Sequence, residues 1–300
     1  MSIRSLLRKF EIKGLVIAFT CVWMGSAYAL SIEPTQEDSL LAQMITRELE
    51  RRHLASDALF AERKPMVGQL ILKAIDPSRS LLTQDDIRQA DIDRLPDQIE
   101  RGRLNTVYQL YGLSLTRSEE RLDYWLDILN QGVGSIDLSD QEELRIRDEE
   151  TPWVSDLASL KDLWRKQLEN QAIGLLLADR TEEETYKALI RRYNSQKNRI
   201  EQTRPDDIFA GVINAYASAY DPHTSYLPPA DSETFNINMS LSLQGIGAVL
   251  QSEDEFTKVV SLIPGGPAEM DGRLKPADRI LSIAQGTESF EDVVGWRLDE

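Results

Sequence analysis

The chain has 300 residues, 41% of them hydrophobic and 28% charged, a composition typical of one large or two ordinary globular domains. Its formal net charge of −16 makes nucleic acids and anionic lipid surfaces poor partners, because both are themselves negatively charged. We therefore exclude nucleic-acid binding.

The first 29 residues have the three parts of a secretory signal peptide. Four basic side chains and one acidic side chain precede an apolar stretch at residues 15–24, and Ala27-Tyr28-Ala29 forms an Ala-x-Ala cleavage site. The apolar stretch is too short to span a bilayer comfortably, so an uncleaved anchor is the less favoured alternative. Cleavage after Ala29 would remove the only cysteine, Cys21, and leave a net charge of −19.

Residues 30–235 are predicted to form a helical domain. Thr83 with Asp86, and Thr181 with Glu184, have the spacing of capping boxes that open helices. Between residues 131 and 156 we expect a surface loop, whose acidic cluster we interpret as a solvated face. Apolar residues recur at helical spacing in the other segments, at 36–59, 66–75, 104–115, 118–129, from 156 past 177, and 205–220.

The chain changes character at Asp221. Residues 221–229 are too rich in proline and turn formers for a helix. Short strands are then predicted at 240–244, 247–251, 258–263 and 279–283, with a short helix after Pro267 and a last helix opening at Val293. We expect this smaller unit, residues 236–300, to be an α+β domain that is incomplete at its C-terminal end, because domains of this size are marginal.

No catalytic machinery is visible in the sequence. Of the two histidines, we expect His53 to be solvated on a charged helix face and His223 to stabilise its own turn. The chain has no Gly-x-Ser-x-Gly elbow, Walker-type loop, dinucleotide fingerprint, His-Glu-x-x-His motif or cysteine pair. We therefore expect no catalytic residue, no metal and no cofactor.

A loop with two glycines, Gly245-Ile246-Gly247-Ala248, is the candidate binding site. Its glycines would let backbone N–H groups converge on a carboxylate, while Ile246 and Ala248 would face an apolar pocket. An extended peptide could then add a strand beside residues 248–251, which is a recognised mode of peptide binding. A plain turn that needs glycine for positive φ is the alternative, and the loop alone leaves both open.

The surroundings of this loop resemble a PDZ domain of the bacterial protease type. The resemblance rests on Gly-Ile-Gly-Ala-Val-Leu at 245–250, Gly-Gly-Pro-Ala at 265–268 and Asp-Arg-Ile at 278–280. Asp-Pro-His-Thr-Ser-Tyr-Leu at 221–227 is similar to the segment that precedes the PDZ domain in C-terminal processing peptidases. Residues 75–87 and 293–299 resemble the tail-specific proteases of Gram-negative periplasms, so the resemblance covers essentially the whole mature chain.

This resemblance implies a periplasmic serine endopeptidase that binds the nonpolar C-termini of its substrates. The family's catalytic serine and lysine lie downstream of the PDZ domain, so no position here inherits those roles. We expect the chain to be the N-terminal and substrate-recognition portion, with Gly245–Ala248 holding the peptide carboxylate and Leu250, Val294 and Leu298 lining the groove. The predicted partners are protein C-terminal tails, with an adaptor on the helical domain and association with the inner membrane left open. A non-catalytic periplasmic peptide-binding or adaptor protein is the alternative, and a helical scaffold without a ligand is a third reading.

Overall fold

The computed structural model describes residues 32–299, apart from residues 55, 56, 140, 141, 149, 241–244, 285, 287 and 288. The predicted signal peptide, and residues 241–244 of the first predicted strand, lie outside the described residues. Within them, no helix combines the length and the apolar character needed to cross a bilayer.

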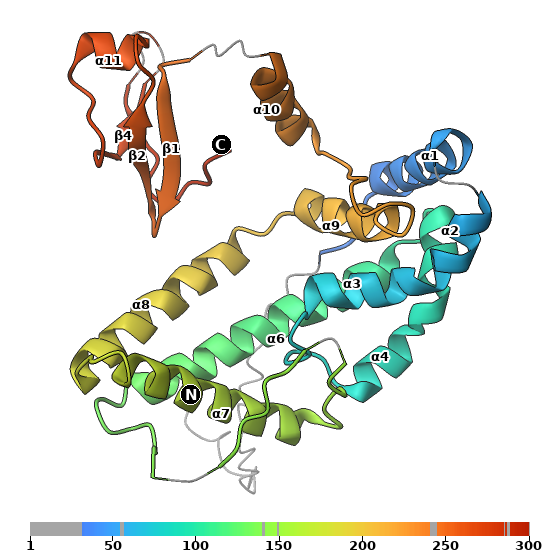
Figure 1. Ribbon diagram of the computed structural model, residues 1–300, viewed down its shortest axis with the longest axis horizontal. Helices are drawn as coiled ribbons and strands as arrows, with labels where there is room; N and C mark the ends of the chain where they lie inside the picture. Colours follow the sequence, from blue (N-terminus) through green and yellow to red (C-terminus); the bar gives the residue numbers. More distant parts are fainter. Residues whose placement is uncertain are drawn as a thin grey trace, which may run out of the picture.

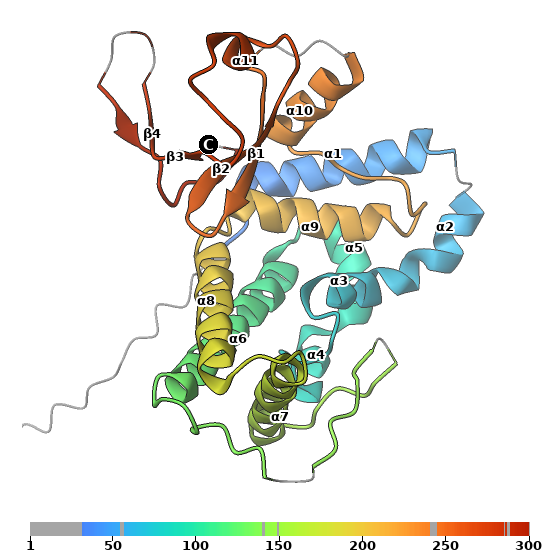
Figure 2. The same cartoon turned by 60° about the vertical axis from the view of Figure 1, so that its left-hand side comes forward.

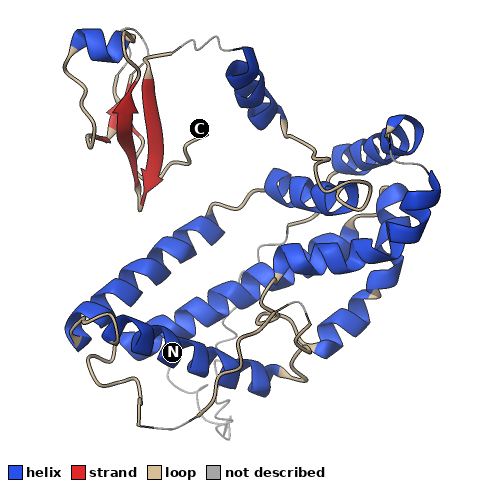
Figure 3. Ribbon diagram, viewed as in Figure 1, coloured by secondary structure: helices blue, strands red, loops and turns tan. Residues whose placement is uncertain are grey.

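Helices fill the first part of the described chain and a small sheet follows (Figures 1 and 3). The helical part is made of α1 (Gln36–Arg52), α2 (Asp57–Arg63), η1 (Lys64–Met66), α3 (Val67–Ile75), α4 (Gln84–Ala90), η2 (Ile92–Arg94), α5 (Leu95–Glu100), α6 (Asn105–Leu129), α7 (Leu157–Leu176), α8 (Glu182–Glu201), α9 (Pro205–Ala217) and α10 (Pro229–Ser240). The second part is made of β1 (Ala248–Glu253), β2 (Phe256–Leu262), α11 (Pro267–Asp271), β3 (Arg279–Ile280), β4 (Ser282–Ile283) and β5 (Glu291–Asp292). The predicted domain boundary at 235/236 falls inside α10, and the fold is the mainly α, then α+β, architecture expected from the sequence.

Two hydrophobic cores lie in the helical part, and α6 contributes to both. Its first half contributes Val107 and Tyr108 to the core with α3 and α9, and its second half contributes Leu122 and Trp125 to the core with α7 and α8. The prediction of two helices, 104–115 and 118–129, was therefore wrong. Burial on both sides of the polar residues between them stabilises one continuous helix, because packing outweighs a local break in the apolar pattern.

Both predicted capping boxes are confirmed. Thr83 accepts a hydrogen bond from Asp86 N while Thr83 N donates to the Asp86 carboxylate, and Thr181 and Glu184 do the same at the start of α8. These reciprocal bonds satisfy amide groups that a helix N-terminus otherwise leaves without partners.

Among its described residues, the predicted surface loop between α6 and α7 forms no helix or strand, as expected, yet part of it is fixed against the helices. Gln84 N donates to Val154 O at 2.9 Å, and the Arg79 guanidinium donates to Thr151 O at 2.8 Å. The connection between α3 and α4 is held by Asp76, whose buried carboxylate accepts hydrogen bonds from the backbone N–H groups of residues 80–82. The loop is therefore partly a structural element and not only a solvated face.

The sheet is antiparallel, with the strand order β1-β2-β3, and a separate pair joins β4 to β5 (Figure 2). Ala248 lies opposite Leu262 and Glu253 lies opposite Phe256, with an irregularity in the register between Val249 and Leu250. Among the described strands, β1 pairs only with β2 and therefore forms an edge of the sheet.

The helix predicted to open at Val293 is not formed. Gly295 has φ +83°, a left-handed conformation that interrupts a helix, and its N–H donates to Glu255 O in the β1–β2 hairpin. Arg297 instead reaches the helical part, where its guanidinium contacts the Asp207 carboxylate at 2.5 Å. Long-range contacts therefore replace the local helical pattern in this segment.

Candidate functional site

In the loop Gly245–Ala248, two carbonyl groups are hydrogen bonded within the protein, whereas two N–H groups have no acceptor among the described residues. Ile246 O accepts a hydrogen bond from Ala268 N at 2.8 Å, and Gly247 O accepts one from Ile263 N at 2.8 Å. The N–H groups of Ile246 and Gly247 donate to no acceptor within the described part of the chain. Because backbone amides rarely stay without partners, this arrangement leaves adjacent donors for an anionic group.

Gly247 is required by the backbone as well as by space. It has φ +77°, and a Cβ at this position would lie 3.2 Å from Gly266 Cα and 3.4 Å from Pro267 Cδ. Gly245 is different, because its φ is not in the left-handed region and a Cβ there would meet no atom within 4 Å. The close approach of Gly247 and Gly266 brings the loop against the start of α11 and fixes where its amides lie.

An apolar hollow of about 460 Å³ lies beside the loop. Ile246, Pro267, Ala268 and Leu274 form its walls, and the ion pair between Asp271 and Arg273 lies among its lining residues. The Ile246 side chain is 53% exposed, although it is large and apolar. An apolar hollow next to free backbone amides has the two components needed to bind a nonpolar residue that ends in a carboxylate.

The edge of the sheet continues this site. β1 begins at Ala248, directly after the loop, and its Val249 side chain is 46% exposed. An edge strand presents unpaired backbone groups to which an extended peptide can hydrogen bond. The loop, the hollow and the edge of β1 therefore adjoin one another.

The structure places the other predicted groove residues away from this hollow. Leu250, on β1 opposite Val259, does not line it, and neither do Val294 and Leu298. Val294 and Leu298 flank contacts with the β1–β2 hairpin and the helical part, because Gly295 N donates to Glu255 O. A groove role for these three residues remains a prediction.

Sequence reasoning missed the contribution of Leu274, Asp271 and Arg273 to the hollow. Gly-Pro-Ala at 266–268 indicates the start of a short helix and carries part of the PDZ resemblance, but nothing in its spacing shows that it packs against Gly247. Gly247 and Gly266 lie in separate loops, and glycines at such positions are the one sequence signal that two backbones approach closely.

The two histidines are held near the end of α9 by different means. His53 follows the last residue of α1 and lies 2.8 Å from Thr224 Oγ1 through its Nε2, so the prediction that it is solvated on a helix face was wrong. The His223 backbone N–H donates to the Asp221 carboxylate at 2.8 Å, so its backbone takes part in the turn, while a role of the imidazole there stays a prediction. Neither contact forms a catalytic triad.

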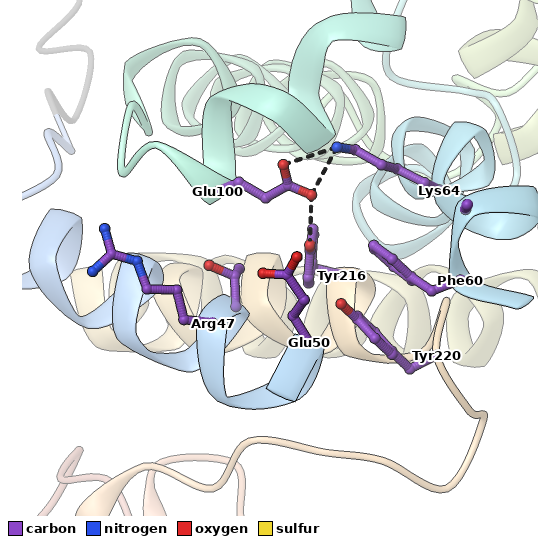
Figure 4. Close-up of a pocket in the computed structure, with 9 residues that line it drawn as sticks. Arg47, Glu50, Phe60, Lys64, Glu100, Tyr216 and Tyr220 are labelled. Atoms are coloured by element: carbon purple, nitrogen blue, oxygen red, sulfur yellow. Dashed lines mark hydrogen bonds and ion pairs between the residues drawn. The ribbon is translucent and has the colours of Figure 1, made fainter. Parts of the chain in front are cut away.

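A second hollow, of about 380 Å³, lies in the helical part (Figure 4). Figure 4 shows the Lys64 ammonium directed at both oxygens of Glu100, which also accepts a hydrogen bond from the Tyr216 hydroxyl at 2.9 Å. Burial opposes the charge on Lys64, but Asp97 and Glu100 raise its pKa above the ordinary value. The Phe60 and Tyr220 rings stack at 3.7 Å in the same wall. Because these charges satisfy one another, we interpret this network as a contact that joins η1, α5 and α9.

Comparison with known proteins agrees with this architecture. A family model described as Tail specific protease N-terminal domain matches residues 45–230, and one described as PDZ domain matches residues 234–300. The Tail-specific protease of Haemophilus influenzae is 34% identical over 310 residues, which cover 97% of this chain and 44% of that protein. The Carboxy-terminal processing protease CtpA of Bacillus subtilis is 32% identical over 84 residues, which cover 28% of this chain and 18% of that protein. The chain thus spans less than half the length of these relatives. Because its helical domain and the PDZ domain that follows both match, the chain belongs to the tail-specific protease family.

Proposed function

We propose that this chain is the substrate-recognition portion of an exported serine endopeptidase that processes or degrades proteins after binding their nonpolar C-termini. The observation that supports this most directly is the loop Gly245–Ala248, whose carbonyls are used internally while the N–H groups of Ile246 and Gly247 remain without a described acceptor. The names of the relatives, a tail-specific protease and a carboxy-terminal processing protease, agree with recognition of protein tails.

In this proposal the terminal carboxylate of a substrate lies at the amides of the loop. Its last side chain enters the hollow formed by Ile246, Pro267, Ala268 and Leu274. The preceding residues extend along β1 and add a strand to the edge of the sheet. Carboxylate and side chain are thus recognised together, which favours apolar C-termini over internal sequences.

Export follows from the sequence of residues 1–29, and we place the protein in the periplasm on the basis of the family resemblance. We propose that the catalytic serine and lysine of the family lie outside these 300 residues, because no residue of the chain matches their motif. An adaptor protein on the helical domain is a further proposed partner.

The experiment compares two peptides that differ only at their end. A fluorescent peptide with an apolar last residue and a free carboxylate is titrated against the chain, and its C-terminally amidated twin is titrated in parallel. A charge-assisted hydrogen bond to the carboxylate contributes about 1.5–3 kcal/mol, so we expect the free acid to bind about ten- to a hundredfold more tightly.

A third peptide, with a free carboxylate and a terminal aspartate in place of the apolar residue, tests the hollow. It should bind more weakly than the apolar peptide, because burial of a charge without a partner is costly. Equal affinity for the free acid and the amide would refute carboxylate binding, and equal affinity for the apolar and acidic ends would refute the role of the hollow.

A further inference from the structure

A third hollow, of about 400 Å³, lies where α6, α7 and α8 meet the loop that joins α6 to α7. Arg121 on α6 and Arg145 and Arg147 on the loop contribute three cationic side chains to its lining. Side-chain amides of α7 and α8, including Gln167, line the rest of its polar surface. Figure 1 shows α6, α7 and α8 as neighbouring helices.

Acidic side chains do not balance these arginines in the hollow itself. None of the described residues that line it is an aspartate or a glutamate, although the whole chain has 50 acidic and 34 basic residues. Two acids of the loop have partners outside the hollow: Glu142 pairs with Arg165 and Lys166, and Asp148 accepts a hydrogen bond from Thr151. In a chain of net charge −16, the hollow is therefore a local concentration of positive charge.

The buried carboxylate that interacts with Arg121 and Arg147 is already engaged. Asp76 is 1% exposed and accepts three backbone hydrogen bonds at 2.8–3.0 Å. Burial lowers the pKa of Arg121 and of Arg147, and the charges of Arg79 and Arg145 lower that of Arg147 further, while Asp76 opposes both shifts. Arg147 is therefore repelled by the neighbouring guanidinium groups of Arg79 and Arg145, and an anion beside it would relieve that repulsion.

Buried polar atoms at the hollow also lack partners. The Nε of Arg121 and the Oε1 of Gln167 are inaccessible to solvent and find no hydrogen-bond partner in the described part of the chain. A buried polar group without a partner is costly, and a bound molecule is one explanation for it. The rest of the Arg121 guanidinium is held in place, because its Nη1 donates to Ser80 Oγ at 3.1 Å. The hollow of Figure 4 differs in this respect, because Glu100 satisfies both Lys64 and Tyr216 there.

We propose that this arginine hollow binds a small organic anion that presents two or more carboxylate or phosphate oxygens. Guanidinium groups bind such oxygens in pairs and remain charged at all physiological pH values. A volume of about 400 Å³ exceeds the space needed for one phosphate ion and falls in the range of ordinary ligand pockets. Side-chain amides in the wall add neutral hydrogen bonds that orient the ligand. The proposal concerns residues of the helical part alone and is independent of peptide binding at Gly245–Ala248.

The test uses citrate and inorganic phosphate as probes, titrated into the intact chain by isothermal calorimetry at low ionic strength. We expect citrate to bind more tightly than phosphate, because it reaches more than one arginine. Replacing Arg145 with glutamine removes one exposed guanidinium from the hollow and should weaken citrate about tenfold or more, as expected for a lost charge-assisted hydrogen bond. Because Arg145 lies on an exposed loop, the variant should keep the circular dichroism spectrum of the unsubstituted chain.

Arg52→Gln is the matched control. It removes the same charge from the end of α1, where Arg52 pairs with Glu48 in solvent, and α1 contributes no residue to the hollow. Citrate affinity should be unchanged in this variant and should fall when sodium chloride is raised. Absence of citrate binding, equal weakening by Arg52→Gln and Arg145→Gln, or tighter binding of phosphate than of citrate would each overturn the proposal.

Discussion

Replacing Gly247 with alanine should loosen the loop that presents the candidate carboxylate site. At φ +77° a residue with a Cβ adopts the left-handed region at a cost of roughly 1–2 kcal/mol. The new methyl group would also lie 3.2 Å from Gly266 Cα, closer than an ordinary van der Waals contact. Gly266 cannot easily move away, because its N–H donates to Ile263 O at 2.9 Å.

Together these effects should lower the local stability of the loop by about 1–2 kcal/mol, which corresponds to about a 5- to 30-fold change in the opening equilibrium. The amides that report on it are Ile263 N and Ala268 N, since they donate to the carbonyls of Gly247 and Ile246. Hydrogen exchange at these two amides should accelerate by that factor, whereas exchange within α6 should not change.

Gly245→Ala is the control two positions earlier. Its φ is not in the left-handed region and its Cβ would enter open space, so exchange at Ile263 and Ala268 should stay within about twofold of the unsubstituted chain. If both alanine variants accelerated exchange equally, the argument from conformation and close approach would be refuted. Gly247→Ala should also weaken binding of the free-acid peptide, because the amides that receive its carboxylate are displaced.

Two further predictions concern contacts outside the loop. Tyr216→Phe removes the hydroxyl that donates to Glu100 and should lower the free energy of unfolding, measured in urea, by about 1–2 kcal/mol. Tyr193→Phe is the control, because it removes a buried hydroxyl that has no described partner. This variant should be as stable as the unsubstituted chain or more stable. Burial alone would raise the pKa of Asp207, but hydrogen bonds from Arg297 and from Arg204 N outweigh it and lower that pKa. The contact with Arg297 therefore contributes stability at neutral pH and is lost as pH falls through the folded-state pKa of Asp207. Hydrogen exchange across residues 293–299 should be faster in Arg297→Gln than in the unsubstituted chain at pH 7, and the difference should shrink below about pH 4. A loss in Tyr193→Phe equal to that in Tyr216→Phe would contradict the first argument. A difference in Arg297→Gln that is as large in acid as at pH 7 would contradict the second, although the bond from Arg297 to Gln202 O is independent of pH and leaves a smaller difference.

Local chemistry made several features predictable from the sequence. The capping boxes at Thr83 and Thr181 need only residues three apart, so their spacing identified two helix starts. The proline-rich turn after Asp221 and the glycine loop at 245–248 were likewise visible, because backbone conformation restricts which residues they can contain.

The candidate site was only partly predictable, because part of it depends on contacts between loops that are separate in the sequence. Gly245–Ala248 could be named from its glycines, whereas Leu274 and Arg273 line the hollow only because Gly247 and Gly266 bring two loops together. Val294 and Leu298 were predicted to line the groove as part of a final helix, which the left-handed conformation of Gly295 prevents in this structure. Leu250 lies on β1 but does not line the hollow.

By itself, the sequence determined the order of a helical domain and a small α+β domain, their capped helix starts and the glycine loop, because these depend on neighbours within a few residues. Tertiary structure decided that α6 is one helix shared by two cores, and that Arg297 leaves its predicted helix to contact Asp207. It also decided that Arg121, Arg145 and Arg147 line one hollow. These outcomes depend on contacts between residues far apart in the sequence, 90 positions in the case of Arg297 and Asp207, and no local pattern encodes such contacts.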